Sequence, residues 1–364
     1  MFFWKTVTIV AVAFFLELVY GSQALAKDGT ERGPSAMVTI CHKPETPAEK
    51  TMMVNLNALQ GHLGHSDLEG PCVLIDAHGQ FDHEVNGEAV INLLDQGGIS
   101  RIILSAIRGR PAGDVADLAV DHPDRITPAV RTKGDGYEDE DRIDQWFQTL
   151  KARVDSGRFK AMAEILMYHT AKRGGEDPEV IVHPHDDRVQ RALGLTLSEN
   201  WPFIVHIEFA AASKKKLNNQ NLADHLMEEL EQLLEEHPDH PFVLIHMGQL
   251  QSDEVRRLIE SHNNIYFMTS QATPVTAEER QPWVNMFDVS GDRLTQEWER
   301  LVRDHPDRFI LAFDNVYREN WNEPDRYLDQ IAFWRKALKW LPINVAEAVA
   351  HGNAERLWNL PRVE

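Results

Sequence analysis

PFIVHIEF, residues 202–209, is a short apolar run that carries His206 and Glu208 near its end. PFVLIHMG, residues 241–248, has the same form and reaches His246. Apolar runs of this length, with no alternation of polar residues, are typical of strands buried on both faces of a parallel sheet. The two stretches therefore predict buried strands, each with ionisable side chains toward its carboxyl end.

Six further runs of this kind extend the pattern in both directions along the chain. They are VLIDAH (73–78), RIILSAI (101–107), ITPAV (126–130), FKAMAEIL (159–166), NIYFMTS (264–270) and RFILAFDN (308–315). Helical patterns recur between the runs and are clearest at 221–236, 253–261 and 323–339. Because parallel strands need crossover connections, usually helices, eight such units predict an α/β fold, a (β/α)8 TIM barrel over residues 73–364. The alternative is an open doubly wound sheet. That fold is expected to have a glycine-rich turn after its first strand, and this sequence has none there. Residues 344–357 predict an extra helix packed on the barrel.

The amino-terminal end has the composition of an export signal. Residues 1–26 contain Lys5, an apolar stretch and the small-x-small sequence at 24–26, which together predict a signal peptide. An uncleaved anchor is the alternative. Residues 27–37 are polar and predict a linker. The expected location is therefore the periplasm or beyond, with no membrane attachment after cleavage. A net charge of -20 disfavours nucleic acid as a partner.

Residues 38–72 form a distinct segment, for which we expect a small Cys/His-containing flap. It holds Cys41 and Cys72, the only two cysteines of the chain. In an oxidising compartment the pair favours a disulfide, which would stabilise the protein by roughly 3 to 4 kcal/mol. Free thiols are one alternative. Another is a zinc site that the cysteines share with His42, His62 and His65.

Titratable residues gather at the carboxyl ends of the predicted strands, where this architecture places its active sites. They are His78, Glu164, His206, His246 and Asp314. Burying such groups without partners is costly, so several of them at separate strand ends indicate a shared site. Imidazoles and a carboxylate suit Zn²⁺ and similar divalent cations, and an aspartate there can accept a proton from water. The sequence contains no G-x-S-x-G turn, so it does not predict a serine nucleophile.

The order Asp-x-His, His, His-x-Gly and Asp over strands one, five, six and eight resembles the amidohydrolase-related (amidohydrolase 2) family of the metal-dependent amidohydrolase superfamily. The resemblance covers residues 73–361 and includes the ending HGNAERLWNLP. It implies that His78, His206 and His246 are metal ligands, and that Asp314 is a ligand or the general base. Asp314 and His246 are the expected catalytic residues. The implied cofactor is a divalent metal, with zinc expected.

One position departs from the family pattern. The first strand of the family ends His-x-His, whereas this chain has His78-Gly79-Gln80. An amide is a weaker ligand than imidazole for a transition metal. Asp82 shares the strand parity of His78 and could replace the missing ligand; otherwise the site works without a tightly bound metal or has lost catalysis. Glu164 either lines the site or pairs with an arginine, and Glu208 either orients a ligand histidine or faces solvent.

The expected function is hydrolysis of a small carbonyl substrate, an amide, ester or lactone, by metal-assisted or His/Asp-assisted attack of water. The alternatives are a ligand-binding barrel without catalysis and a decarboxylase of the same barrel group. Two insertions, 169–200 and 271–291, follow strands four and seven and are expected to shape the substrate site. The sequence does not predict an oligomeric state.

Overall fold

The computed structural model describes residues 36–171, 179–277 and 281–362, and the chain from Ala36 onward forms one compact unit. The predicted signal peptide and residues 27–35 of the linker lie outside the described residues. The linker was predicted to extend to Met37, but Met37 already begins strand β1. Among the residues that the structure describes, no helix combines the length and apolar character needed to cross a membrane.

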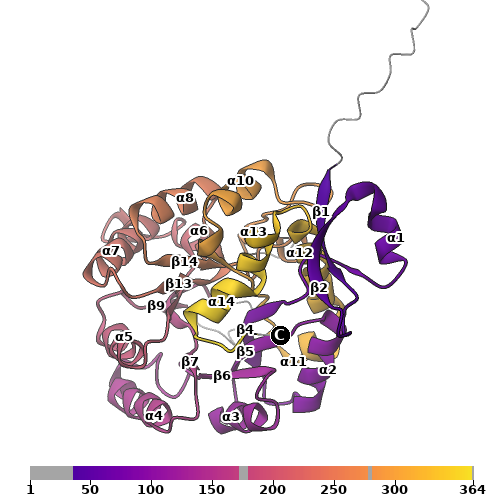
Figure 1. The fold of residues 1–364 in the computed structure, drawn as a ribbon. Coiled ribbons are helices and arrows are strands. Elements are labelled where there is room, and N and C mark those ends of the chain that lie inside the picture. The colour runs from indigo at the N-terminus through magenta and orange to yellow at the C-terminus, as the bar shows by residue number, and fades with distance from the viewer. Residues whose placement is uncertain (1–35, 172–178, 278–280, 363–364) are drawn as a thin grey trace, which may run out of the picture. The chain divides into compact units, whose positions relative to one another are not determined.

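The barrel is built from two sheets of parallel strands, as the sequence predicted (Figure 1). One sheet has the order β4-β5-β6-β7 and the other β15-β14-β13-β10-β8-β9. The barrel strands are β4 (Ile75–Phe81), β5 (Arg101–Ala106), β6 (Ile126–Val130), β7 (Ala161–Met162), β8 (Ile165–His169), β10 (Phe203–Ile207), β13 (Phe242–Leu244), β14 (Ile265–Met268) and β15 (Phe309–Ile310). In the second sheet, β9 (Val180–Ile181) adds to β8 in the antiparallel sense, outside the barrel pattern.

Two junctions close the barrel. The amide of Ala77 donates to Leu311 and that of Gln80 donates to Asn315, so the end of the eighth strand runs beside β4. At the other junction the predicted fourth strand is divided into β7, which pairs with β6, and β8, which pairs with β10. Glu164 lies in the gap between β7 and β8, and its carbonyl accepts from the Thr132 hydroxyl.

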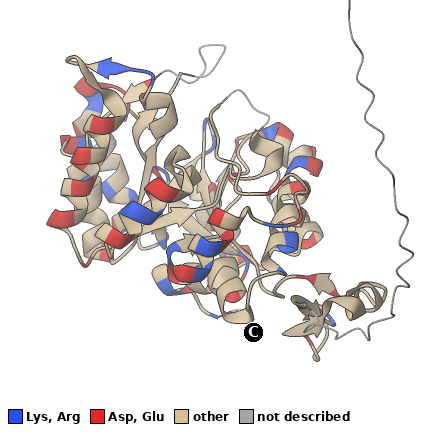
Figure 2. Ribbon diagram, turned by 90° about the horizontal axis from the view of Figure 1, so that it is seen from above, with Lys and Arg blue, Asp and Glu red and all other residues tan. Residues whose placement is uncertain are grey.

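Helices follow the barrel strands, apart from β7, which continues into β8, and they cover the outside. The main helices are α2 (Gly87–Gly97), α3 (Ala112–Asp121), α4 (Ile143–Asp155), α5 (Asp187–Glu199), α7 (Leu222–Glu236), α8 (Ser252–Ser261), α10 (Gln296–Asp304) and α12 (Asp325–Leu338). Shorter helices are α6 (Phe209–Ala212), α9 (Pro274–Ala277) and α11 (Arg318–Asn322). In α7, Leu222, Leu226 and Leu230 repeat at the spacing of one helical face and are buried against the strands. Acidic and basic residues are interspersed along the helices (Figure 2).

The interior of the barrel is a packed layer of mostly small and branched side chains, including Ala77, Ala129, Ile204 and Val243. The predicted carboxyl-terminal helix is observed as α13 (Ile343–Glu347), a π-turn and α14 (Asn353–Leu357). Leu357 and Trp358 pack into the same layer, and the Arg101 side chain at the start of β5 donates to the Pro361 carbonyl. This segment therefore closes the end of the barrel at which the strands begin.

The amino-terminal module contains a sheet of order β2-β1-β3 (Figure 1). Its elements are β1 (Met37–His42), β2 (Lys50–Asn55), α1 (Leu59–Leu63) and β3 (Leu68–Glu69). It packs on the carboxyl-terminal end of α12, where Thr39 bonds to the Lys339 and Leu341 carbonyls. Each helix of the barrel runs back to the end of the barrel at which the next strand begins. Because the module packs on the carboxyl-terminal end of α12, it lies at that end, opposite the mouth. The flap does not cover the predicted site.

Candidate active site

A cavity of about 620 Å³ lies at the carboxyl ends of the barrel strands. Its wall includes Gln80, Glu164, His206, His246 and Asp314, which belong to five different strand ends. The two predicted insertions also contribute, the first through His169 and Val180 and the second through Gln271, Gln281 and Trp283. The fold thus brings most of the predicted site residues to one cavity.

Asp314 is the hub of this site. Its Oδ1 lies 3.0 Å from His78 Nε2 and accepts from Gln80 Nε2 at 2.9 Å, and its Oδ2 accepts from Gln271 Nε2 at 3.1 Å. His78 is buried behind Asp314 and Gln80 and does not form part of the cavity wall. The amide of Asp314 donates to the His78 carbonyl, so the closing junction of the barrel itself sets this contact.

His246 is placed by an irregular turn. Strand β13 ends at Leu244, two residues earlier than the apolar run suggests, and residues 246–249 all have positive φ. Non-glycine residues rarely adopt this conformation, which costs on the order of 1–2 kcal/mol each. The turn directs His246 so that Nδ1 is 2.8 Å from Ser270 Oγ and Nε2 is 3.7 Å from Asp314 Oδ2. Gln271 and Asp314 also have positive φ, so strain concentrates at this site.

His206 and Glu164 form a wall of the cavity next to His246. His206 Nδ1 lies 3.3 Å from Glu164 Oε2, and its Nε2 lies 3.4 Å from Glu208 Oε1. Glu208 is buried rather than solvent-facing, and it also accepts from the Thr170 amide. Glu164 pairs with the ammonium group of Lys133, not with an arginine. Lys133 in turn lies 3.4 Å from Gln80 Oε1, which links this wall to Asp314.

The surroundings fix the protonation of two site residues. Burial alone would raise the pKa of Asp314, but the facing His78, by its charge and hydrogen bond, and the charge of Lys133 hold this pKa well below its usual value. Burial lowers the pKa of His246 well below its usual value; the charge of Asp314 opposes this shift, and His206, His78 and Lys133 add to it. At neutral pH the site therefore offers an ionised aspartate beside an uncharged imidazole.

Asp82 corrects one expectation. It was considered a substitute for the missing histidine because it shares the parity of His78 and Gln80. In the structure its Oδ1 accepts from the His83 amide and its Oδ2 from the Arg318 amide, and it does not form part of the cavity wall. The parity argument fails because β4 ends at Phe81, so Asp82 belongs to the turn that follows.

Several residues of the cavity were not singled out from the sequence. Lys133 and Arg131 follow β6, Gln271 follows β14, and His169 ends β8. The rule that found the histidines, a polar residue at a strand end, would have found these too if it had been applied to every polar residue type. Trp283, whose ring lies 5.0 Å from that of His246, has no such signal because it comes from within an insertion.

A family model described as Amidohydrolase matches residues 114–360. The chain belongs to this amidohydrolase family. No curated protein matches the sequence. Among solved structures, an uncharacterized TIM-barrel protein from Bordetella bronchiseptica has 15% identity and a TM-score of 0.50, with 79% of this chain and 99% of that chain covered. At this identity the likeness shows a shared fold only.

Two further solved structures resemble this amidohydrolase more weakly. A probable 2-pyrone-4,6-dicarboxylic acid hydrolase from Acinetobacter baumannii, with citric acid bound, has 13% identity and a TM-score of 0.44, with 79% and 99% of the two chains covered. An amidohydrolase from Burkholderia multivorans with bound zinc has 15% identity and a TM-score of 0.44, with 79% and 100% covered.

The donor atoms of the cavity fit a divalent cation. Ligand atoms around one Zn²⁺, each at about 2.0–2.2 Å, lie roughly 3 to 4 Å from one another. Here Glu164, His206 and His246 each present a ligand atom within 4.8 Å of the others, and Asp314 Oδ2 is 3.7 Å from His246 Nε2. Gln80 does not present a ligand atom in the same way, because its amide nitrogen donates to Asp314. A cation would therefore be held on the side of His206 and His246.

Proposed function

We propose that this amidohydrolase is a hydrolase of small carbonyl compounds that carry a carboxylate, with Asp314 as the general base. The observation that carries the proposal is the convergence of Asp314, His246, His206 and Glu164 on one cavity at the mouth of the barrel. Esters, lactones and amides are the substrate classes considered, because each is cleaved by attack of water on a carbonyl carbon.

In the proposed reaction, Asp314 accepts a proton from the attacking water as the water oxygen bonds to the carbonyl carbon. Asp314 then returns this proton to the leaving oxygen or nitrogen as the scissile bond breaks. The ammonium group of Lys133 supplies positive charge for the carbonyl oxygen while that oxygen gains negative charge. Glu164, His206 and His246 would hold a divalent cation, which would supply Lewis acidity and make water easier to deprotonate.

The guanidinium groups of the cavity wall support a substrate with a carboxylate. The cavity wall includes four basic side chains, Arg108, Arg131, Lys133 and Arg326, beside four carboxylates, Glu138, Glu164, Glu208 and Asp314. Arg108 stacks on the Tyr317 ring, 4.6 Å from its centre, which holds a planar cation at the wall. A guanidinium group binds carboxylates through paired hydrogen bonds. Two of the carboxylates, Glu164 and Asp314, accept hydrogen bonds or pair with Lys133, Gln80 and Gln271.

The test is a panel of esters, lactones and amides, each offered with and without a carboxylate, against the purified protein. Hydrolysis is expected only where the substrate carries the carboxylate, and Arg108→Gln should raise KM for those substrates more than it lowers kcat. Arg158→Gln makes the same charge change at the surface, where Arg158 pairs with Asp117, and should leave KM unchanged.

Two other outcomes would replace the proposal. Release of CO₂ without uptake of water would indicate a decarboxylase. Stoichiometric binding of panel compounds, with no product from any of them, would indicate a ligand-binding barrel in which Gln80 marks the loss of catalysis. Incorporation of ¹⁸O from labelled water into the product distinguishes hydrolysis from both.

A further inference from the structure

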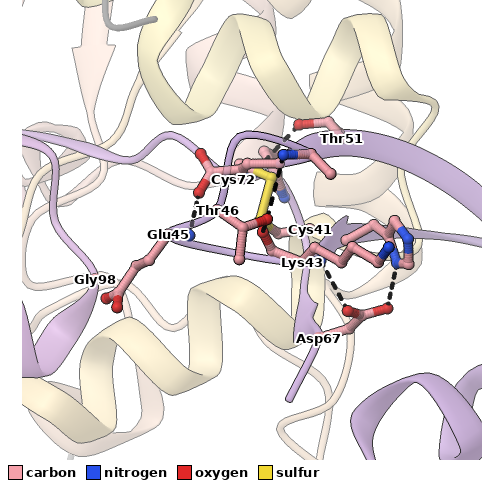
Figure 3. Close-up of a disulfide and its surroundings, with 12 residues drawn as sticks. Cys41, Lys43, Glu45, Thr46, Thr51, Asp67, Cys72 and Gly98 are labelled. Atoms are coloured by element: carbon pink, nitrogen blue, oxygen red, sulfur yellow. Dashed lines mark hydrogen bonds and ion pairs between the residues drawn. A yellow bond between two sulfur atoms is a disulfide. The ribbon is translucent and has the colours of Figure 1, made fainter. Parts of the chain in front are cut away.

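The amino-terminal module contains a second cluster of potential metal ligands, far from the barrel cavity. His42 at the end of β1, His62 in α1 and Asp67 just before β3 come together on one carboxylate oxygen. Asp67 Oδ2 lies 2.8 Å from His42 Nδ1 and 2.7 Å from His62 Nδ1. The two imidazole rings are 5.8 Å apart and nearly perpendicular. Figure 3 shows Asp67 beside the disulfide, with its dashed contacts to Lys43 and a ring.

The arrangement requires the carboxylate of Asp67 to be buried inside the module. The side chain of Asp67 is only 1% exposed, in a module whose buried apolar core consists of Val38, Ile40, Val54 and Leu59. Burying a carboxylate is expensive unless it is fully engaged. Oδ1 of Asp67 accepts from the Lys43 amide at 2.8 Å, which holds the carboxylate in one orientation.

The backbone around the cluster is also strained. Lys43, which follows His42, has a φ of 50°, and Ser66, which precedes Asp67, has a φ of 69°. Both residues lie in the left-handed region, which disfavours side chains other than glycine. The chain thus adopts unfavourable conformations on both sides of the cluster, and these conformations bring His42 and Asp67 together.

The cysteines are excluded as ligands. The structure places a disulfide between Cys41 and Cys72, so neither offers a thiolate. The alternative of a zinc site shared between cysteines and histidines therefore does not fit this structure. The disulfide instead ties the end of β1, next to His42, to the segment that enters the barrel (Figure 3). His65, which the sequence also offered as a ligand, is exposed and does not join the cluster.

We propose that the module binds one zinc ion between Nδ1 of His42, Nδ1 of His62 and Oδ2 of Asp67. Two imidazoles and one carboxylate form a ligand set that Zn²⁺ favours, with ligand distances of about 2.0–2.2 Å. The three donor atoms need to separate only slightly to admit the ion. In the present contacts each Nδ1 donates its proton to Asp67 Oδ2, so binding of zinc at Nδ1 requires this proton to leave, either to Nε2 of the same ring or to water.

The site has access to solvent and is independent of the barrel cavity. The side chains of His42 and His62 are 25% and 27% exposed, which leaves a fourth coordination position for water or for an external ligand. The module is attached to the opposite end of the barrel through Lys339, whose ammonium group bonds to Glu69 at 2.6 Å. Zinc in the module therefore takes no part in the chemistry proposed at Asp314.

The experiment counts zinc in the full chain. The purified protein is stripped with a chelator, incubated with excess ZnCl₂ and desalted, and the bound zinc per chain is measured by mass spectrometry. His62→Ala and Asp67→Asn should each bind one zinc fewer than the wild type. His65→Ala, a histidine change three residues along the chain, should keep the wild-type number. His206→Ala, in the barrel, should keep the zinc of the module.

Asp67→Asn preserves the size of the side chain, so the module can stay folded without the carboxylate. Circular dichroism and a thiol count of zero on each variant confirm that the fold and the disulfide are intact. An equal zinc count in the wild type, His62→Ala and Asp67→Asn would overturn the proposal and make the cluster a hydrogen-bonded staple. That result would not touch the barrel mechanism, which the substrate panel tests separately.

Discussion

Replacing Asp314 with asparagine is the most direct perturbation of the proposed mechanism. The change keeps the volume of the side chain but removes the group that accepts the proton. A positioned general base contributes roughly 10² to 10⁴ in rate, which corresponds to about 3 to 5 kcal/mol in the barrier. We therefore expect kcat/KM of Asp314→Asn to fall by about that factor for any substrate found in the panel.

The contacts of Asp314 also set the stability cost of this variant. Gln80 can still donate to the remaining oxygen, but the new amide group would face Gln271 Nε2, which is 3.1 Å from Asp314 Oδ2. Rotation of the Gln271 amide is opposed because its Oε1 already accepts from Arg326 at 3.3 Å. The lost hydrogen bond should cost about 1–3 kcal/mol of unfolding free energy.

Asp82→Asn is the matched control, because Asp82 is a carboxylate just after β4 that is more buried than Asp314 and does not form part of the cavity wall. It should lose stability and keep kcat/KM. The assay combines initial rates with urea unfolding of both variants. If Asp314→Asn retained the wild-type kcat/KM while remaining folded, Asp314 would not be the base and the mechanism would be wrong.

Three further predictions concern stability. His240 is buried, and burial, with the nearby charge of His237, lowers its pKa from 6.5 to about 4. The unfolded chain therefore binds a proton that the folded chain does not, and the stability that His240 contributes above pH 6.5 is lost as the pH falls toward 4. Relative to His240→Gln, the wild type should lose about 2 kcal/mol between about pH 7 and pH 4.5, measured by urea unfolding at each pH. The Cys41→Ser/Cys72→Ser double variant should lose about 3–4 kcal/mol, and an unchanged melting temperature would contradict the stabilising role of the disulfide. Tyr327→Phe removes a buried hydroxyl that bonds Asp76 Oδ2 at 2.8 Å and should cost about 1–3 kcal/mol in urea unfolding, whereas a cost near zero would show that Asp76 finds another donor.

Much of the fold could be read from the sequence because buried parallel strands leave a strong local signal. The apolar runs at 101–107 and 126–130 correspond to β5 and β6 with almost the same bounds. The runs that carry site residues were less accurate at their ends: β13 stops at Leu244 and β15 at Ile310, before His246 and Asp314. An apolar run does not show where a strand ends and a strained turn begins. The predicted strands therefore extend beyond the observed ones at their carboxyl ends.

The sequence by itself determined the residue types of the barrel site and their order along the chain. Polar residues at strand ends can be recognised without coordinates, because all parallel strands of a barrel end at the same face. Only the tertiary structure decided which of them meet. In the tertiary structure Asp82 bonds to the turn after β4 instead of lining the cavity. Lys133 contacts both Glu164 and Gln80. His42 and His62 both contact one oxygen of Asp67. Such contacts join positions far apart in the chain or separated by irregular turns, and their geometry depends on backbone angles and packing that periodicity does not encode.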